Sequence, residues 1–293
     1  MSSGVSIRML ETPLDMARAE ELQSLVWPES ETDVVPAHVM LAFARNGGLA
    51  MAAFDGQRLV ALVLGFLGTD SNSPERIAMT RLKHCSHQLA VHPDYRDRGL
   101  GMMLKRAQRA VVIDQGIRLI TWMCDPLLSR SAHLNIRRLG GVCGVYIREA
   151  YGETRDGLTA GEPSDRLQVD WWITSRRVAT RLEGERRPLD LASFLAAGAQ
   201  ELNPATLGAD GLPRPAASIL EPIGNLALVE IPSDYLEIRR KDRDLALAWR
   251  RHTRQILEQA LDRGYIVTDF VHLRGARHPR SFYLLSHGEA TVG

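Results

Sequence analysis

The sequence predicts an α/β fold, and three features of the chain indicate it. Apolar strand-like segments alternate with segments of helical periodicity over residues 1–175, as expected when helices pack on a central sheet. Residues 87–101, which read HQLAVHPDYRDRGLG, take the chain from a strand-like segment through a turn and directly into an amphipathic helix. Residues 176–293 differ in character and predict a smaller C-terminal α+β lobe.

The elements of the first 175 residues are marked by local signals. Pro13 stands near the start of the first expected helix, Asp55-Gly56 is a strong hairpin turn, and Gly140-Gly141 closes the last helix. The expected strands cover residues 6–11, 49–54, 59–67, 84–91, 117–123, 142–150 and 166–173. The expected helices cover residues 13–27, 36–45, 100–115 and 130–139.

The remaining residues begin with a basic segment, 176–187, that we expect to be a surface connection. Further along, the patterns predict one helix, residues 244–262, and strands at 226–231, 265–273 and 281–286. These elements could pack as a separate lobe or complete the sheet of the first part.

Composition limits the classes of function. The chain has 293 residues, 45% of them hydrophobic and 24% charged, as in a globular protein. Lys and Arg (36) nearly balance Asp and Glu (35), so we expect neither a nucleic-acid nor a membrane partner. The longest apolar stretch is too short to cross a bilayer, and the N-terminus lacks signal-peptide features. Three cysteines without a CxxC pair favour a cytoplasmic location.

The segment R-x-x-G-x-G, from Arg96 to Gly101, carries the main functional signal. Gly99 and Gly101 lack a Cβ atom, so a ligand can approach their backbone amides closely. Free amides at a helix N-terminus, together with the helix dipole, bind phosphate or pyrophosphate. The spacing fits neither the dinucleotide-binding G-x-G-x-x-G motif nor a P-loop.

This R-x-x-G-x-G loop, the preceding L-A-V-x-P and the order β-α-α-β-β-β-α-β-α-β-β resemble the GNAT superfamily of N-acyltransferases. The resemblance implies a mixed central sheet flanked by helices. It also implies that residues 1–175 are an acyl-CoA-binding catalytic domain. Residues 176–293 would then be a lobe on the substrate side or in an oligomer contact.

The resemblance further implies acetyl-CoA or another acyl-CoA as co-substrate, and no metal. Backbone groups of one strand would hold the pantetheine, the glycine loop would hold the pyrophosphate with added charge from an arginine, and a later helix would lie beside the pantetheine. The corresponding residues are Leu89, Ala90 and Val91 in the strand, Arg96, Asp97, Arg98, Gly99, Leu100, Gly101 and Met102 in the loop, and Ser131 and Asn135 in the helix.

In one respect the chain departs from the family pattern. Members commonly have Asn, Ala and Tyr along the helix after the fifth strand, where this chain has Ser129, Ala132 and Ile136. The Tyr that often protonates the departing CoA thiolate in this family is therefore absent. The identity of the general acid, and the need for one, stay open. The segments 125–141 and 163–171 look like a smaller branch linked in part with N-acyl amino acid metabolism, a clue to the substrate.

His87 and Asp125 are the candidate catalytic residues. A neutral His87 imidazole could deprotonate an ammonium substrate, since its pKa lies near working pH; a packed strand histidine is the alternative. Because successive side chains of a strand point to opposite faces of the sheet, we expect Cys85, His87 and Leu89 on one face and His84 on the other. The two histidines would therefore be poorly placed to bind one metal ion together.

Asp125 follows a strand at the end where α/β sites gather, and a helix cap with an ion pair is the alternative reading. Cys124 has no recognisable His and acid around it, so direct transfer is expected rather than an acyl-enzyme. The sequence thus predicts an EC 2.3.1 acyltransferase that moves an acetyl or other short acyl group to the amine of a small molecule, with an amino acid as one candidate. A homodimer is one option for its assembly. The alternative function is a non-catalytic acyl-CoA-binding regulatory or interaction module.

Overall fold

A computed structural model describes residues 4–28, 34–70, 76–152, 162–184, 189–275 and 278–288. These residues form two compact units, one up to Trp122 and one from Met123 onward. The expectation that residues 1–175 form a catalytic domain stays a prediction, because a catalytic domain and a compact unit need not end at the same residue.

The first unit contains a mixed sheet in the order β1-β2-β3-β4-β5. Its strands are β1 (Val5–Met9), β2 (Leu49–Asp55), β3 (Arg58–Thr69), β4 (Leu82–Val91) and β5 (Leu119–Cys124), whose last two residues belong to the second unit. Neighbours from β1 to β4 run antiparallel, whereas β4 and β5 run parallel. The predicted mixed sheet and the hairpin at Asp55-Gly56 are confirmed.

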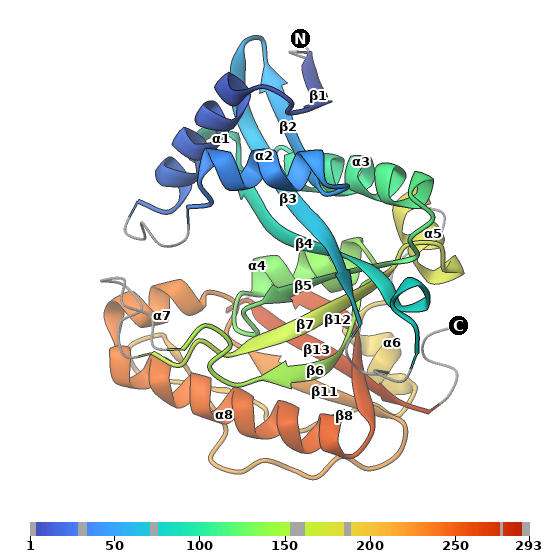
Figure 1. The fold of residues 1–293 in the computed structure, drawn as a ribbon. Coiled ribbons are helices and arrows are strands. Elements are labelled where there is room, and N and C mark those ends of the chain that lie inside the picture. Colours follow the sequence, from blue (N-terminus) through green and yellow to red (C-terminus); the bar gives the residue numbers. More distant parts are fainter. Residues whose placement is uncertain are drawn as a thin grey trace. The chain divides into compact units, whose positions relative to one another are not determined.

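Helices cover both faces of this sheet. Helices α1 (Pro13–Val26) and α2 (Ala37–Arg45) lie on one face and α3 (Leu100–Asp114) on the other (Figure 1). Successive side chains of β3 point to opposite faces of the sheet, so this strand contributes to the hydrophobic core on each face. Leu62 and Leu64 pack under α1 and α2. Val63 packs with Leu100 and Leu104 of α3. The four helices predicted in the first 175 residues are all present, close to their expected bounds.

A β-bulge interrupts β4 at His87. Leu64 pairs with Gln88 but Gly65 pairs with Ser86, so His87 is the extra residue. The bulge reverses the alternation: Ser86 hydrogen-bonds with Gln108 of α3, yet Leu89 also packs on the α3 side. The prediction that Cys85 and Leu89 share a face is therefore wrong, because one inserted residue moves every later side chain to the other face.

The second unit contains a sheet in the order β7-β6-β12-β13-β11-β8. Its strands are β6 (Val142–Ile147), β7 (Arg166–Trp172), β8 (Gln200–Glu201), β11 (Leu226–Ile231), β12 (Tyr265–Leu273) and β13 (Arg280–His287), with a separate pair β9 (Thr206–Leu207) and β10 (Pro213–Arg214). Val267 of β12 pairs with Cys143 of β6. The C-terminal strands therefore extend the sheet that holds β6 and β7.

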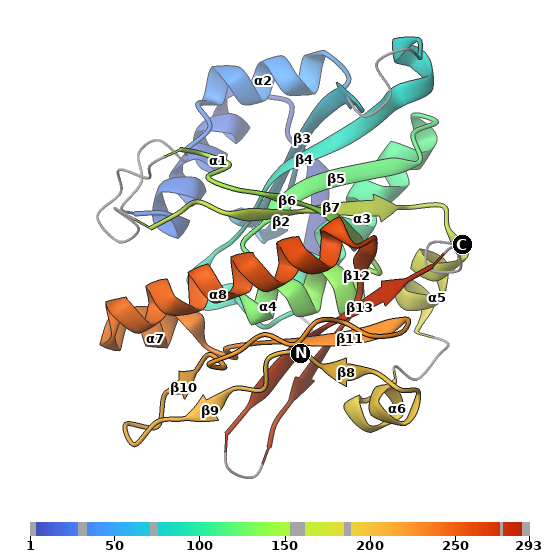
Figure 2. The same cartoon turned by 90° about the horizontal axis from the view of Figure 1, so that it is seen from below.

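Helix α8 (Arg243–Asp262) packs along β6, β11 and β12, where it buries Trp249 and Leu257 (Figure 2). The other helices are α4 (Ser129–Ala132), which continues as the π-helix η4 (His133–Arg138), then α5 (Arg176–Glu183), α6 (Leu191–Ala196) and α7 (Tyr235–Lys241). Residues 176–187 were expected to be a surface connection, but Arg176–Glu183 form helix α5. Ser175 caps this helix and Val178 is buried. Residues 185–187 lie outside the described part of the chain. Helices α6 and α7 were not predicted.

Candidate functional site

The loop between β4 and α3 turns sharply. His92 caps the one-turn helix η3 (Pro93–Tyr95), its Nδ1 accepting the Asp94 N–H at 3.2 Å. Asp97 and Gly99 then adopt left-handed backbone angles, with φ of 63° and 79°. A left-handed residue other than glycine is uncommon and marks a constrained turn. The left-handed glycine is Gly99, whereas Gly101 lies inside the first turn of α3.

The amide groups at the start of α3 point out of the helix end. The first backbone bond of the helix runs from the Met103 N–H to the Gly99 carbonyl at 3.1 Å, and no described residue accepts from the N–H groups of Leu100, Gly101 or Met102. Residues 96–99 are exposed. Open amides at the positive end of a helix dipole form an anion-binding arrangement.

The two arginines of this loop differ in their surroundings. The Arg98 guanidinium stacks on the Tyr95 ring, 4.7 Å from its centroid, and the Tyr95 hydroxyl donates to Asp55 at 2.8 Å. This chain of contacts ties Arg98 to the end of β2. Arg96 is exposed.

Strand β4 keeps one edge unpaired near its end. Among the described residues, β5 pairs with β4 only at His84↔Ile120 and Cys85↔Thr121. Leu89, Ala90 and Val91 pair with β3 on one side. Because alternate residues of a strand direct their N–H and C=O groups to opposite edges, part of this segment presents backbone groups to the other side. An extended ligand can add to such an edge.

His87 is exposed at the bulge. Its ring lies 6.1 Å from the Phe66 ring, which contacts Phe43 of α2 at 5.1 Å. The site therefore has an imidazole beside the free edge of β4, with aromatic packing on one side. Its role as a base stays a prediction.

A buried polar cluster supports β4 from the α3 side, and sequence reasoning missed it. The Lys105 ammonium group, 2% exposed, donates to Ser86 Oγ at 2.7 Å and to Gln108 Oε1 at 3.1 Å, and lies 3.8 Å from the Trp122 ring centroid. No described carboxylate lies within ion-pair distance of it. Burial lowers the pKa of Lys105 to about 7. Burial, and secondarily the Lys105 charge, lowers the pKa of His84 to about 4.

A sequence signal for this cluster existed in α3. Lys105 and Gln108 are three residues apart, Gln108 follows Leu104 by four, and all three are among the buried residues of the helix. Polar residues on the core face of an amphipathic helix are the pattern that would have revealed it.

In the second unit, Asp125 makes a bidentate ion pair. Its oxygens accept from Arg250 at 2.7 and 2.8 Å, and Oδ1 also accepts the Leu127 N–H at 2.8 Å. Arg250 is 3% exposed and its guanidinium lies 5.0 Å from the Tyr235 ring. These contacts are the ones expected if Asp125 acts as a helix cap and ion-pair partner, the alternative to a catalytic role. A catalytic role for Asp125 stays a prediction.

Ser131 and Asn135 lie together on α4 and η4. Asn135 Nδ2 donates to Ser131 Oγ at 3.1 Å, and the Asn135 carbonyl accepts the Gly141 N–H at 3.0 Å. The helix predicted at residues 130–139 is thus present but turns into a π-helix, a form frequent at functional sites. Ile136 is buried at 1% exposure, and Ser129 hydrogen-bonds with Ser281 at 2.9 Å.

Cys124 and Cys143 are free and buried in the second unit. Burial and the neighbouring Cys124 raise the pKa of the Cys143 thiol, which keeps it protonated and a poor nucleophile. Among the described residues, no group of three or more His, Cys, Asp or Glu side chains could hold a metal ion. No helix of the described chain has the length and apolarity needed to span a membrane.

The predicted site residues fall into two sets. His87, residues 89–91 and residues 96–102 lie in the first unit and follow one path from the bulge of β4 to the first turn of α3. Asp125, Ser131 and Asn135 lie in the second unit.

Solved structures of N-acetyltransferases are similar to part of this chain. The ribosomal-protein-S18-alanine N-acetyltransferase from Escherichia coli is 17% identical, with a TM-score of 0.43 over 59% of this chain and 96% of that one. An N-acetyltransferase from Staphylococcus aureus Mu50 is 12% identical, with a TM-score of 0.46 over 59% of this chain and 100% of that one. The polyamine N-acetyltransferase of Drosophila melanogaster is 17% identical, with a TM-score of 0.43 over 57% of this chain and 99% of that one.

Among curated proteins, none matches the chain. The model of the acetyltransferase (GNAT) family matches residues 14–140, a stretch that includes β4, the R-x-x-G-x-G loop and α3. Residues 14–140 of this chain therefore form a domain of the acetyltransferase (GNAT) family, whose members use acetyl-CoA as co-substrate.

Proposed function

We propose that this protein transfers an acetyl or other short acyl group from acyl-CoA to the amine of a small molecule by direct attack. The observation that carries the proposal is the loop between β4 and α3, where open amides at a helix start adjoin a free strand edge. Pyrophosphate and pantetheine need these two features side by side.

In this proposal the pyrophosphate accepts hydrogen bonds from the amides of Leu100, Gly101 and Met102. The left-handed turn at Asp97 and Gly99 directs these amides outward. Arg96 and Arg98 add positive charge, and charge-assisted contacts to phosphate are the stronger kind.

The pantetheine would lie along Leu89, Ala90 and Val91, hydrogen-bonded to the edge that β5 leaves free. This contact would hold the thioester carbonyl near the bulge at His87. Backbone N–H groups that stabilise the developing oxyanion, together with correct positioning, supply much of the rate in such reactions.

The chemical step starts with an uncharged amine. His87 would take a proton from the ammonium form, and the amine nitrogen then attacks the thioester carbonyl carbon. The C–N bond forms, the C–S bond breaks, and the thiolate leaves as CoA while the amide nitrogen gives up its remaining extra proton. Because Ile136 is an apolar buried residue, the proton for the thiolate would come from solvent or from the base rather than from that position.

Direct attack is preferred to an acyl-enzyme. A nucleophilic cysteine needs a lowered pKa and an adjacent base, whereas burial raises the pKa of Cys143. The three unpaired thiols also favour a cytoplasmic location. The acceptor would be a small amine, an amino acid being one candidate, and Asp125, Ser131 and Asn135 are further candidates for substrate or cofactor contacts.

Turnover tests the reaction itself. The protein is incubated with acetyl-CoA or succinyl-CoA and a panel of amines and amino acids, and the free thiol is followed. Catalytic release of CoA with at least one amine supports the proposal. Binding of acyl-CoA with no release favours a non-catalytic acyl-CoA-binding module, the second candidate, which the buried Ile136 in place of a tyrosine supports.

A matched pair of variants tests the loop assignment. Gly101→Val places a β-branched side chain beside the amides proposed to bind pyrophosphate, and should weaken CoA binding at least about tenfold, the effect of losing a hydrogen bond to a charged group. Ala110→Val makes a similar change on the exposed side of the same helix and should leave affinity unchanged. Titration calorimetry measures both. Equal CoA affinity in the two folded variants would remove the loop from the CoA site.

A further inference from the structure

Four polar side chains, those of His84, Ser86, Lys105 and Gln108, form a cluster between β4 and α3, and each is at most 5% exposed. Ser86 Oγ accepts hydrogen bonds from Lys105 Nζ at 2.7 Å and from Gln108 Nε2 at 3.1 Å. Gln108 Nε2 also lies 3.2 Å from His84 Nε2. The acyl transfer proposed above uses none of these four residues.

This cluster is costly to bury. Lys105 has no carboxylate within ion-pair distance among the described residues. The Gln108 amide oxygen accepts from Lys105 at 3.1 Å, so the amide nitrogen donates to His84 Nε2, and a neutral His84 has its proton on Nδ1. That Nδ1 is buried and has no hydrogen-bond partner. Apolar side chains of similar volume are often more stable than such groups, and buried titratable groups of this kind gather at functional sites.

The cluster holds β4 at the residue where its bulge begins. Among the described residues, Cys85 is the last of β4 to pair with β5. Ser86 pairs with Gly65 of β3, and His87 is the extra residue. Paired residues of neighbouring strands point to the same face, so the residue opposite Gly65 lies on the α3 side. With Ser86 in that place, His87 stays out of the core and is exposed.

A bulge one residue earlier would exchange these places. His87 would pair with Gly65 and turn toward α3, where the His84 ring is so close that a Cβ on Gly65 would lie 2.1 Å from its Nε2. Ser86 would become the extra residue, and the Lys105 ammonium would lose its closest acceptor. A buried ammonium without an acceptor is strongly unfavourable. The charge-assisted bond from Lys105 is also stronger than the neutral bond from Gln108, so it contributes most to keeping the bulge at His87.

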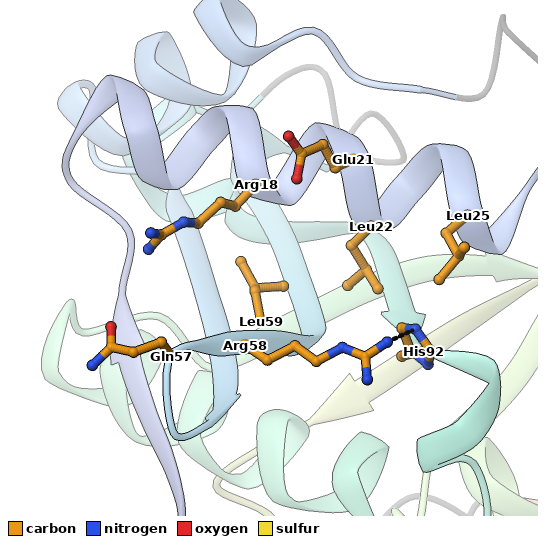
Figure 3. Close-up of a pocket in the computed structure, with 8 residues that line it drawn as sticks. All are labelled: Arg18, Glu21, Leu22, Leu25, Gln57, Arg58, Leu59 and His92. Carbon is orange, nitrogen blue, oxygen red and sulfur yellow. Dashed lines mark hydrogen bonds between the residues drawn. The ribbon is translucent and has the colours of Figure 1, made fainter.

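The far end of the same strand is held separately. Nη2 of Arg58 lies 2.7 Å from Nε2 of His92, beside the pocket between α1 and the start of β3 (Figure 3). The His92 N–H donates to the Val60 carbonyl at 2.9 Å. Residues 87–91, which include the imidazole and the free edge, therefore lie between two fixed points.

We propose that Lys105 is a positioning residue for acyl transfer. By holding Ser86, its ammonium group fixes the bulge and so places the His87 imidazole beside the free edge of β4. The inference rests on the proposed function, because the position of this imidazole affects turnover only if His87 faces the reacting amine. A charge that lowers the stability of the fold is then retained because it places the base.

The first test is Lys105→Met, in which stability and turnover should move in opposite directions. The variant keeps the length of the side chain, yet kcat should fall by ~10–10²-fold, since a misplacement of about 1 Å can slow a reaction ~10²-fold. The KM for acyl-CoA should change little, because residues 89–91 and the loop before α3 keep their places. Val112→Ala, in the buried face of α3 about two turns beyond Lys105, is the matched control. It should lower the stability and leave kcat unchanged.

Ser86 provides a second set of variants. Ser86→Ala removes the acceptor and should lower kcat at least as much as Lys105→Met. Because the two residues act as a unit, a double variant with Ser86→Ala and Lys105→Met should be no slower than Ser86→Ala alone. Ser86→Thr keeps the hydroxyl group and should retain most of the turnover. Losses that multiply in the double variant would overturn the proposal, and thermal melting verifies that each variant is folded.

NMR spectra test the positioning without any turnover. The ring signals of His87 and the amide signals of residues 86–88 should shift in Lys105→Met and in Ser86→Ala, and stay in place in Val112→Ala. Unchanged His87 signals in folded Lys105→Met, or an unchanged kcat, overturn the proposal. A wild type that acylates no amine overturns the proposed function and with it the effect on turnover, whereas the spectra still decide whether Lys105 fixes the bulge.

Discussion

Replacement of Lys105 by methionine should stabilise the protein. Lys105 is 2% exposed and has no carboxylate partner among the described residues, and burial lowers its pKa from the ordinary 10.5 to about 7. At about 1.4 kcal/mol per pKa unit, this difference corresponds to about 5 kcal/mol for holding the cation in the folded protein. Lys105→Met removes that cost and keeps an unbranched side chain of similar length.

The measured gain should be smaller, several kcal/mol, since the variant also removes hydrogen bonds. Ser86 Oγ and Gln108 Oε1 lose the Lys105 donor. Each keeps a partner, because Ser86 Oγ accepts from Gln108 Nε2 at 3.1 Å and Gln108 Oε1 accepts from Ser86 Oγ at 3.2 Å. Replacing a buried charge by an apolar group of similar volume is often stabilising.

The gain depends on pH in a direction that the lowered pKa fixes. Below about pH 7 the lysine is protonated in both states and the folded protein bears the full cost. Between about pH 7 and 10.5 the folded protein releases the proton while the unfolded chain keeps it, so the stability of the wild type rises with pH. The advantage of Lys105→Met should therefore be largest at pH 6 to 7 and shrink toward pH 10.

Urea unfolding followed by tryptophan fluorescence at pH 6, 7, 8 and 9 measures the difference. Lys83→Met, a half-buried lysine of the same strand that bears Ser86, is the control and should stay within about 0.5 kcal/mol of the wild type. Destabilisation by Lys105→Met would refute the reasoning. A gain that is the same from pH 6 to pH 9 would refute it as well.

Three further changes have definite expected outcomes. His87→Ala should lower turnover by ~10²–10⁴-fold with little change in acyl-CoA affinity, as for loss of a general base; near-normal turnover with an unchanged pH profile would make His87 a packing residue. Asp125→Asn should lower the free energy of unfolding by ~3–5 kcal/mol, because it leaves Arg250, 3% exposed, without its carboxylate. A loss of activity at unchanged stability would instead favour a catalytic Asp125. Truncation after Arg176 removes β12, the partner of β6, and should give an insoluble protein; a soluble, fully active product would contradict this.

The sequence by itself determined the elements whose signals are local. The spacing of apolar residues and the turn at Asp55-Gly56 placed most strands and helices of the first 175 residues, since side-chain periodicity and turn chemistry act within a few residues. The R-x-x-G-x-G spacing located the loop before α3 for the same reason. Helices α6 and α7 were not predicted, because they are short and their capping residues, Asp190 and Asp234, lie in segments without clear periodicity of apolar residues.

Only the tertiary structure decided which side chains meet. The bulge at His87 depends on the pairing of β4 with β3, and it reverses the faces that simple alternation assigns. Lys105 became a buried amine only when α3 packed on β4, and Asp125 found Arg250 across 125 residues of chain. Burial and ion pairing are properties of distant segments brought together, and no local pattern specifies which segments those are.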